Sequence, residues 1–313
     1  MSGKKRYIMY LQSIMVSCFN NIFETENPTH RPLLEVLDEM GLTKKNCNTR
    51  VKSTVEMIRR SSTPVEQDKL KVRLLPVICP SGTFAKRSDS SLIEYNGIVC
   101  LDLDDVLVPE GIKIVAMKFP YTLAAIVSPT GKGVKVFVLT DLKDPSRHND
   151  LYHHLGSVMG FKARLDLKFD PSCSNPSRAC FMSYDEAIMV NKDVVPYHVD
   201  LDTLPVYTPP TKAPSTPVGK TDIAYDEIGF PPSLSDPLKI RTAIKESHTL
   251  FEEYYPMHQG VRNNNLYVLA FFFRLEGIPE DVASDYLVAY YVDPAGGFTA
   301  TEIRTTVHSA YTR

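Results

Sequence analysis

Apolar residues follow two different patterns in the two parts of the chain. In the first 200 residues, short apolar runs between Gly, Pro and Asp predict β-strands at residues 15–19, 75–78, 98–101, 123–127, 134–139 and 179–183. Helical spacing of apolar residues predicts helices at residues 32–40, 53–60 and 149–159. Since helices and strands are interleaved, this part is expected to be α+β.

The last 80 residues have a different texture. Helical spacing dominates at residues 237–254, 264–276, 279–291 and 299–311, which predicts a small helical bundle. Between residues 202 and 222, five prolines stand among Thr, Ser and Lys, and this composition is typical of a semi-rigid linker. We therefore expect an α+β domain at residues 1–201, a Pro-rich linker at 202–235 and an all-α domain at 236–313.

Composition excludes several classes of protein. The chain has 313 residues, 43% of them hydrophobic, so a wholly disordered or fibrous chain is excluded. With 35 Lys and Arg against 37 Asp and Glu, any affinity for phosphates must come from local clustering of basic residues. No apolar run approaches the length of a membrane helix, and we expect a soluble, cytoplasmic protein without a membrane partner.

The six cysteines are widely spaced and form no C-x-x-C pair, which argues against a zinc ribbon and a disulfide framework. A zinc site of His153, His154, Cys173 and Cys180 is disfavoured. Adjacent histidines on a helix face different ways, and the cysteine spacing is not a familiar one.

Two carboxylates come at the end of a buried strand. Asp102 and Asp104 are two residues apart, so on a strand both project to one face. Closely spaced carboxylates repel each other, and Mg²⁺ or Mn²⁺ relieves the repulsion. A polar turn that ends the strand is the alternative.

A loop rich in glycine and lysine follows. Gly131 and Gly133 let the backbone approach a ligand, while hydroxyls and ammonium groups could bind phosphates. The candidate ligands are Ser128, Thr130, Lys132 and Lys135. The spacing is not that of a Walker A loop. A plain glycine-bearing hairpin is the alternative.

A third polar cluster lies further along the chain. Asp170 ends another predicted strand, with Asp166 as the competing carboxylate. Arg178 precedes the strand at 179–183, where its planar guanidinium could hold phosphate oxygens. Taken alone, this segment also fits an ordinary turn.

These three motifs, in this order, resemble the archaeo-eukaryotic primase superfamily, in particular its bacterial BT4734-like, or VirE N-terminal, branch. The resemblance extends to residues 16–25, 74–77, 81–84 and 181–185. It implies a primase-like core with an RRM-like sheet and an N-terminal α/β module. Residues 260–264, 266–277 and 298–311 resemble the small PriCT-like helical domain that follows many of these primases.

The resemblance also implies roles for the site residues. Asp102, Asp104 and Asp170 would bind the metal and act in catalysis, and residues 128–135 would bind the incoming nucleotide. Lys135 stands where the superfamily generally has a histidine. The implied activity is that of a DNA primase or primase-polymerase, which transfers nucleotides from dNTPs or NTPs on a single-stranded DNA template. Related proteins are often fused to a helicase. Because this chain has no Walker motif, we expect a separate helicase partner.

Two other functions remain open at this stage. Residues 101–108 also resemble the opening motif of haloacid-dehalogenase-like phosphohydrolases, in which Asp102 would be phosphorylated. Alternatively, the chain is a catalytically silent replication module that binds single-stranded DNA or a helicase.

Basic residues concentrate in the first third of the chain. Residues 1–100 contain 15 Lys and Arg against 10 Asp and Glu. This excess is where we expect the template backbone to bind. The candidate DNA-binding residues are Lys44, Lys45, Arg50, Lys52, Arg59, Arg60, Lys86 and Arg87.

Overall fold

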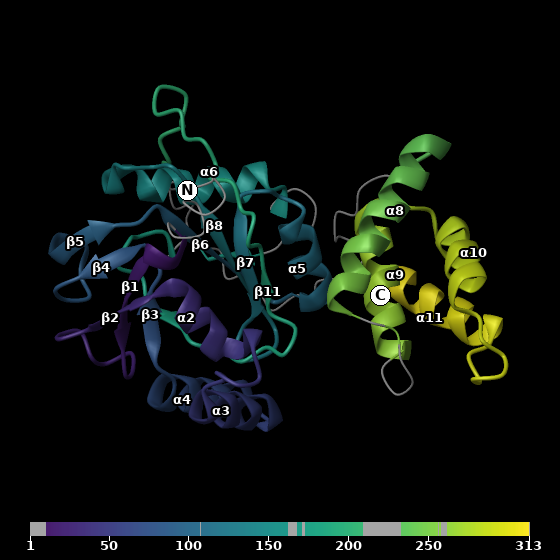
Figure 1. Cartoon of the computed structure of the whole chain (residues 1–313), viewed down its shortest axis with the longest axis horizontal. Helices are drawn as coiled ribbons and strands as arrows, with labels where there is room; N and C mark the ends of the chain where they lie inside the picture. Colours follow the sequence, from purple (N-terminus) through teal and green to yellow (C-terminus); the bar gives the residue numbers. More distant parts are fainter. Residues whose placement is uncertain are drawn as a thin grey trace, which may run out of the picture. The chain divides into compact units, whose positions relative to one another are not determined.

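The computed structural model describes residues 11–106, 108–161, 168–170, 173–208, 233–255, 257 and 262–312. The chain divides into two compact units, which we describe separately (Figure 1). The N-terminal unit comprises residues 1–159 and 167–205, and the C-terminal unit comprises residues 160–166 and 206–313. The expected fold class is confirmed: a mixed unit of helices and antiparallel sheets precedes a helical one.

Two antiparallel sheets form the framework of the N-terminal unit. The first has the order β10 (Cys180–Phe181), β3 (Val77–Cys79), β1 (Met15–Phe19), β2 (Thr29–Pro32). The second has the order β11 (Met189–Val190), β7 (Thr122–Val127), β8 (Val134–Leu139), β6 (Ile98–Asp104), β9 (Lys168–Phe169). A separate hairpin joins β4 (Gly82–Phe84) to β5 (Leu92–Tyr95).

One hydrophobic core lies between these sheets. It unites residues of both sheets with α2 (Leu33–Leu37) and α3 (Thr49–Arg60). From β6, Ile98 and Cys100 contact this core, so Val99, Leu101 and Leu103 point to the opposite face. Against the second sheet pack α5 (Pro109–Met117), on β7 and β8, and α6 (His148–Val158), on β6. The even-numbered face of β6 is therefore the one that looks towards the first sheet.

Sequence periodicity missed six elements of this unit: β2, β4, β5, β11, α5 and α4 (Pro64–Leu74). Nearly every residue of α5 is buried, and a helix that is apolar on all sides has no amphipathic pattern. In α4 the buried residue is the polar Gln67, whereas Val65 is exposed, so its hydrophobic pattern is misleading. The helix expected at 53–60 begins earlier, at Thr49, because Asn48 caps it by accepting the Val51 N–H at 3.1 Å.

The C-terminal unit consists of α8 (Pro237–Tyr254), α9 (Arg262–Leu275), α10 (Glu280–Tyr291) and α11 (Ala300–Thr312). Its core centres on α9, where Leu266, Leu269, Phe272 and Phe273 are fully buried. Most of the expected linker, residues 209–232, lies outside the described residues. Within the described ranges, no helix combines the length and the apolar character needed to cross a membrane.

Candidate active site

The strand register places acidic and basic side chains in one row across the second sheet. Asp102 on β6 lies directly opposite Lys135 on β8. On the other side of β6, Leu103 lies opposite Phe169 of β9, so Asp170 follows at the level of Asp102. Side chains of directly opposed residues point to the same face of a sheet. Lys135, Asp102 and Asp170 therefore form a cross-strand row on the face that looks towards the first sheet.

At the centre of the row is a buried ion pair. The Lys135 Nζ atom lies 2.5 Å from Asp102 Oδ2, and the two side chains are 9% and 17% exposed. Burial opposes the charge of Lys135, but the Asp102 carboxylate nevertheless raises the pKa of this lysine well above its usual value. The second oxygen, Asp102 Oδ1, is buried and has no hydrogen-bond donor among the described residues. One oxygen of the Asp102 carboxyl group is therefore available to a further ligand.

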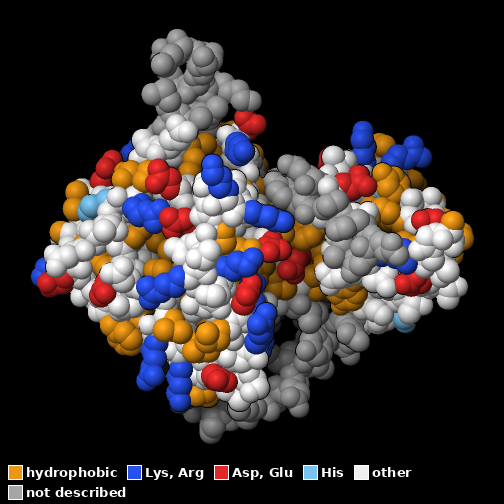
Figure 2. Space-filling model, turned by 60° about the horizontal axis from the view of Figure 1, so that its bottom comes forward, with side chains coloured by type: hydrophobic (Ala, Val, Ile, Leu, Met, Phe, Trp, Pro, Cys, Tyr) orange, Lys and Arg blue, Asp and Glu red, His pale blue; other side chains and the backbone are white. Residues whose placement is uncertain are grey.

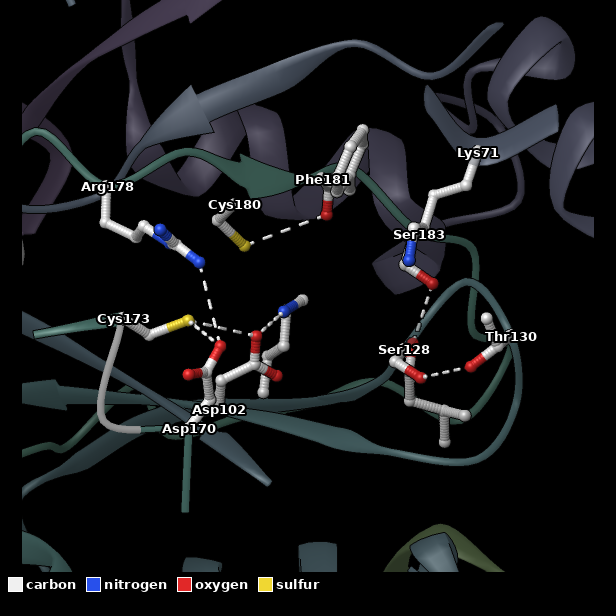
Figure 3. Close-up of polar contacts among 12 residues, drawn as sticks. Lys71, Asp102, Ser128, Thr130, Asp170, Cys173, Arg178, Cys180, Phe181 and Ser183 are labelled. Atoms are coloured by element: carbon white, nitrogen blue, oxygen red, sulfur yellow. Dashed lines mark hydrogen bonds and ion pairs between the residues drawn. The ribbon is translucent and has the colours of Figure 1, made fainter. Parts of the chain in front are cut away.

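Asp170 contacts two residues that follow it in the chain, Cys173 and Arg178 (Figure 3). Its Oδ2 atom accepts a hydrogen bond from the Cys173 thiol at 3.1 Å and lies 3.6 Å from the Arg178 guanidinium. The same thiol is 3.7 Å from Asp102 Oδ2, so Cys173 lies between the two carboxylates. Burial raises the pKa of Cys173 to about 12, so this thiol stays protonated and donates. The site therefore combines two carboxylates with two cationic side chains.

Asp104 lies at the exposed end of β6, two residues beyond Asp102. Partial desolvation of its carboxyl group raises the pKa of Asp104, and the negative charges of Asp102 and Asp170 add to this effect. The three carboxylates thus repel one another across the site. They are not gathered around one point: among the described residues, no group of three or more His, Cys, Asp or Glu side chains is arranged to hold a metal ion.

The donor set nevertheless fits a hard divalent cation. Mg²⁺ and Mn²⁺ prefer carboxylate oxygens, and the site offers a buried, unpartnered oxygen on Asp102 beside two further carboxylates. Mutual repulsion of these groups is what such a cation would relieve.

A tight turn connects β7 to β8 beside the row. The Ser128 N–H donates to the Gly133 carbonyl at 2.8 Å, and Gly131 has a φ of 77°, which favours glycine. Gly133 is required by close packing, because a Cβ atom there would lie 2.7 Å from the Leu103 carbonyl oxygen and 3.3 Å from Asp104 Oδ1. This glycine lets the loop approach the acidic strand end.

Two polar side chains, the buried Asp185 and the exposed Arg59, hold this loop from behind. The Asp185 Oδ2 atom accepts from the Val127 N–H at 3.0 Å and from Lys113 Nζ at 2.6 Å. From α3, the Arg59 guanidinium donates to the carbonyls of Ser128 at 3.1 Å and Tyr184 at 2.9 Å. Sequence reasoning missed Lys113 because it lies in the apolar α5, where only the fold reveals a buried charge.

A small pocket lies between the second sheet, which carries Asp102 and Lys135, and the segment that carries Arg178. Its lining includes Ser81, Cys100, Asp102, Lys135, His148 and Arg178. Burial lowers the pKa of His148 to about 4, so the ring is neutral at pH 7, and its Nδ1 atom bonds the Tyr95 hydroxyl at 2.7 Å. Asp89 fixes the segment that carries Arg178, since its carboxylate accepts the Ser177 N–H at 2.8 Å. Sequence motifs had not indicated His148 or Asp89.

The structure brings together Asp102, Asp170, Lys135 and Arg178, as described above. Ser128 and Thr130 lie in the neighbouring turn, where their hydroxyls are 3.2 Å apart, and Lys132 is exposed there (Figure 3). Asp166 lies outside the described residues. The four residues considered for zinc have other neighbours. His153 contacts the Tyr152 ring with centroids 5.3 Å apart, and His154 bonds the Tyr197 hydroxyl at 2.9 Å. The Cys173 thiol bonds Asp170, and the free thiol of Cys180 is hydrogen-bonded with that of Cys100.

The candidate DNA-binding residues differ in their surroundings. Lys86 pairs with Glu26 at 2.7 Å, Lys52 bonds the Tyr184 hydroxyl at 2.9 Å, and Arg87 donates to the Ile22 carbonyl at 2.5 Å. Figure 2 shows basic side chains distributed over one face of the N-terminal unit, interspersed with acidic and apolar ones. Those that are exposed near the start of α3 or at its end are Lys44, Lys45, Arg50, Arg59 and Arg60, and of these Arg59 binds the two loop carbonyls described above.

The chain was compared with known proteins. Residues 69–189 match the family model described as BT4734-like, N-terminal domain. No curated protein matches the chain. Among solved structures, one similar chain is the AEP domain of the cyanophage S-2L primase-polymerase, with 14% identity and a TM-score of 0.32, covering 64% of this chain and 96% of that one. Another is the primase RepB', with 10% identity and a TM-score of 0.31, covering 99% of this chain and 95% of that one.

The matched segment contains β6, β8 and β9 with Asp102, Lys135, Asp170 and Arg178, whereas Arg59 on α3 lies before it. The resemblance to the BT4734-like family that the motifs predicted is confirmed for residues 69–189, which are similar to the BT4734-like N-terminal domain.

Proposed function

We propose that this protein is a primase-polymerase, which joins nucleotides from dNTPs or NTPs on a single-stranded DNA template. The observation that carries the proposal is the row of Lys135, Asp102 and Asp170 with Arg178 facing it. Carboxylates that would hold divalent cations lie there beside cationic groups that would bind phosphates. Nucleotidyl transfer needs this combination, because negative charge develops on the triphosphate while a hydroxyl attacks it.

The chain's own residues would bind and orient the nucleotide. Arg178 presents a planar fork at the pocket, which suits two oxygens of one phosphate. Lys135 contributes a compact positive charge from β8, and the turn at residues 128–133 contributes hydroxyls and backbone N–H groups. The rigid supports of this turn, Arg59 and Asp185, would keep these groups aimed at the triphosphate.

Asp102, Asp104 and Asp170 would hold Mg²⁺ or Mn²⁺. When bound there, such an ion makes a hydroxyl more acidic and offsets charge on the phosphates. The protein contributes the fixed carboxylates, and the Cys173 thiol keeps Asp102 and Asp170 in position by donating to them.

The template would lie along the basic surface near α3. Lys44, Lys45, Arg50 and Arg60 are its main candidates, because they are exposed. Lys52, Lys86 and Arg87 already have acidic, hydroxyl or carbonyl partners and would contribute less. We assign Arg59 to support of the nucleotide loop. A separate helicase remains the expected partner in DNA replication.

The other two functions are less well supported. In haloacid-dehalogenase-like phosphohydrolases the motif that residues 101–108 resemble normally opens the domain, whereas here β1 to β5 and α2 to α4 precede β6. A silent module that only binds DNA or a helicase would have no need of the facing acidic and basic groups.

The test is primer synthesis and primer extension on a single-stranded DNA template with Mn²⁺ or Mg²⁺. Asp102→Asn with Asp104→Asn is expected to reduce both activities by at least about 1,000-fold, since removing one electrostatic contact at such a site costs about 100- to 1,000-fold. Asp105→Asn is the matched control. It removes a carboxylate from the same strand end, and Asn tolerates the φ of 55° found at this residue.

Full activity of the double variant would contradict the proposal. Wild-type protein that binds the template but incorporates no nucleotide would favour the silent module. Phosphate release from small phosphoesters that depends on Asp102 would favour the phosphohydrolase.

A further inference from the structure

Asp102 already has a cation beside it, the ammonium group of Lys135. The pair is close, at 2.5 Å, and both side chains are largely buried. The antiparallel register of β6 and β8 fixes the two backbones opposite each other, so the contact does not depend on a mobile loop. The charge of Asp102 is therefore neutralised before any divalent cation arrives.

A divalent cation at Asp102 would have to share the carboxylate with this ammonium. Two positive charges within a few ångströms repel strongly in a site that excludes water, where the effective dielectric constant is about 20 rather than 80. Lys135 must therefore weaken the binding of a divalent cation to the empty site. Lys132, in the preceding turn, is exposed and would have a much smaller effect.

A nucleotide could relieve this repulsion. Lys135 and Arg178 line the same small pocket, so a triphosphate bound by Arg178 would bring its negative charge to the lysine. The lysine side chain has a flexible stem of four carbons. Rotation about its bonds lets the ammonium group move from a carboxylate to a phosphate without any movement of the strand. Asp102 would then present both oxygens to the metal.

We propose that Lys135 acts as a built-in counter-ion that keeps the divalent-cation affinity of the empty site low and couples metal binding to nucleotide binding. This proposal rests on the proposed function, because it takes Asp102 to be a metal ligand. It makes Lys135 a positioning residue for the metal as well as a phosphate ligand. Metal and nucleotide then bind together, and neither fills the site productively without the other.

The experiment measures Mn²⁺ binding to the full chain by electron paramagnetic resonance, with and without a non-hydrolysable dNTP analogue. In the absence of nucleotide, Lys135→Met and Lys135→Gln are expected to bind Mn²⁺ at least about tenfold more tightly than the wild type, which corresponds to about 1.4 kcal/mol. The glutamine variant keeps a hydrogen-bond donor for Asp102, should the methionine variant fail to fold. Lys143→Met, which makes the same change in net charge at an exposed lysine outside the site, is expected to match the wild type.

The nucleotide analogue should tighten Mn²⁺ binding more in the wild type than in either Lys135 variant. Equal affinities of the empty wild type and the Lys135 variants would overturn the proposal. So would a wild type that binds Mn²⁺ equally tightly with and without the analogue, and that measurement needs no variant at all.

Asp102→Asn separates this proposal from the proposed function. If Mn²⁺ binding, even with the analogue, is indifferent to Asp102→Asn, then Asp102 is no metal ligand and the proposed function fails. If binding depends on Asp102 but not on Lys135, only the counter-ion role fails.

Discussion

The buried ion pair of Lys113 and Asp185 offers a sharp test of how the nucleotide loop is held. The two atoms Lys113 Nζ and Asp185 Oδ2 are 2.6 Å apart, and their side chains are 0% and 8% exposed. Asp185 also accepts the N–H groups of Val127 and Ala187, at 3.0 and 2.9 Å. Replacing Lys113 by Met keeps the volume of the stem but leaves the carboxylate without its counter-ion.

Loss of one partner of a buried pair costs about 3–5 kcal/mol, because the remaining charge stays desolvated. In a domain of this size, each kcal/mol lowers the melting temperature by about 2–4 °C, so Lys113→Met should lower it by about 6–20 °C. The double variant with Asp185→Asn leaves no charge unpaired, and it should recover about 1–3 kcal/mol relative to the sum of the single variants.

Urea unfolding followed by far-ultraviolet circular dichroism measures the free energy of unfolding of each variant, and a thermal melt measures its melting temperature. Both are taken from the unfolding transition that differs between the variants and the wild type. Lys143→Met serves as the control, since Lys143 is exposed and its replacement should change the free energy of unfolding by less than about 0.5 kcal/mol. Strictly additive single variants would refute the reasoning, because additivity means that Lys113 and Asp185 do not stabilise each other.

Two further predictions concern the site itself. Gly133→Ala should lower nucleotide incorporation and destabilise the N-terminal unit by about 1–3 kcal/mol, since the new Cβ would lie 2.7 Å from the Leu103 carbonyl oxygen. A thermal melt and a primer-extension assay measure these effects. A variant with unchanged stability and activity would contradict the close packing at Gly133. His148 should make the protein less stable in acid. Burial depresses the pKa of His148 from 6.5 to about 4, so the unfolded chain binds the proton more readily, and stability is full above pH 6.5 and falls as the pH drops towards 4. The loss is about 3 kcal/mol. His148→Gln, measured by urea unfolding at pH 7 and pH 4.5, should reduce this pH dependence, and an identical dependence in both proteins would count against it.

Motifs in the sequence indicated the centre of the site because they lie on regular strands. Alternation along residues 98–104 predicted that Asp102 and Asp104 share a face, and β6 runs through both. Lys135 and Asp170 were identified as candidates for the same reason, because each lies near the end of a predicted strand. The local pattern was less informative for α5, whose residues are nearly all buried, and it therefore gave no sign of Lys113.

The order of the acidic, glycine-rich and basic motifs, the α+β and helical parts, and the resemblance to a primase family are all readable along the chain. Which charged side chains meet depends on the folded protein. The ion pair of Lys135 with Asp102 joins residues 33 positions apart, and that of Lys113 with Asp185 joins residues 72 apart. Such partners are chosen by strand register and by packing between sheets. A buried charge needs a specific partner, and only the folded chain determines which one lies within reach.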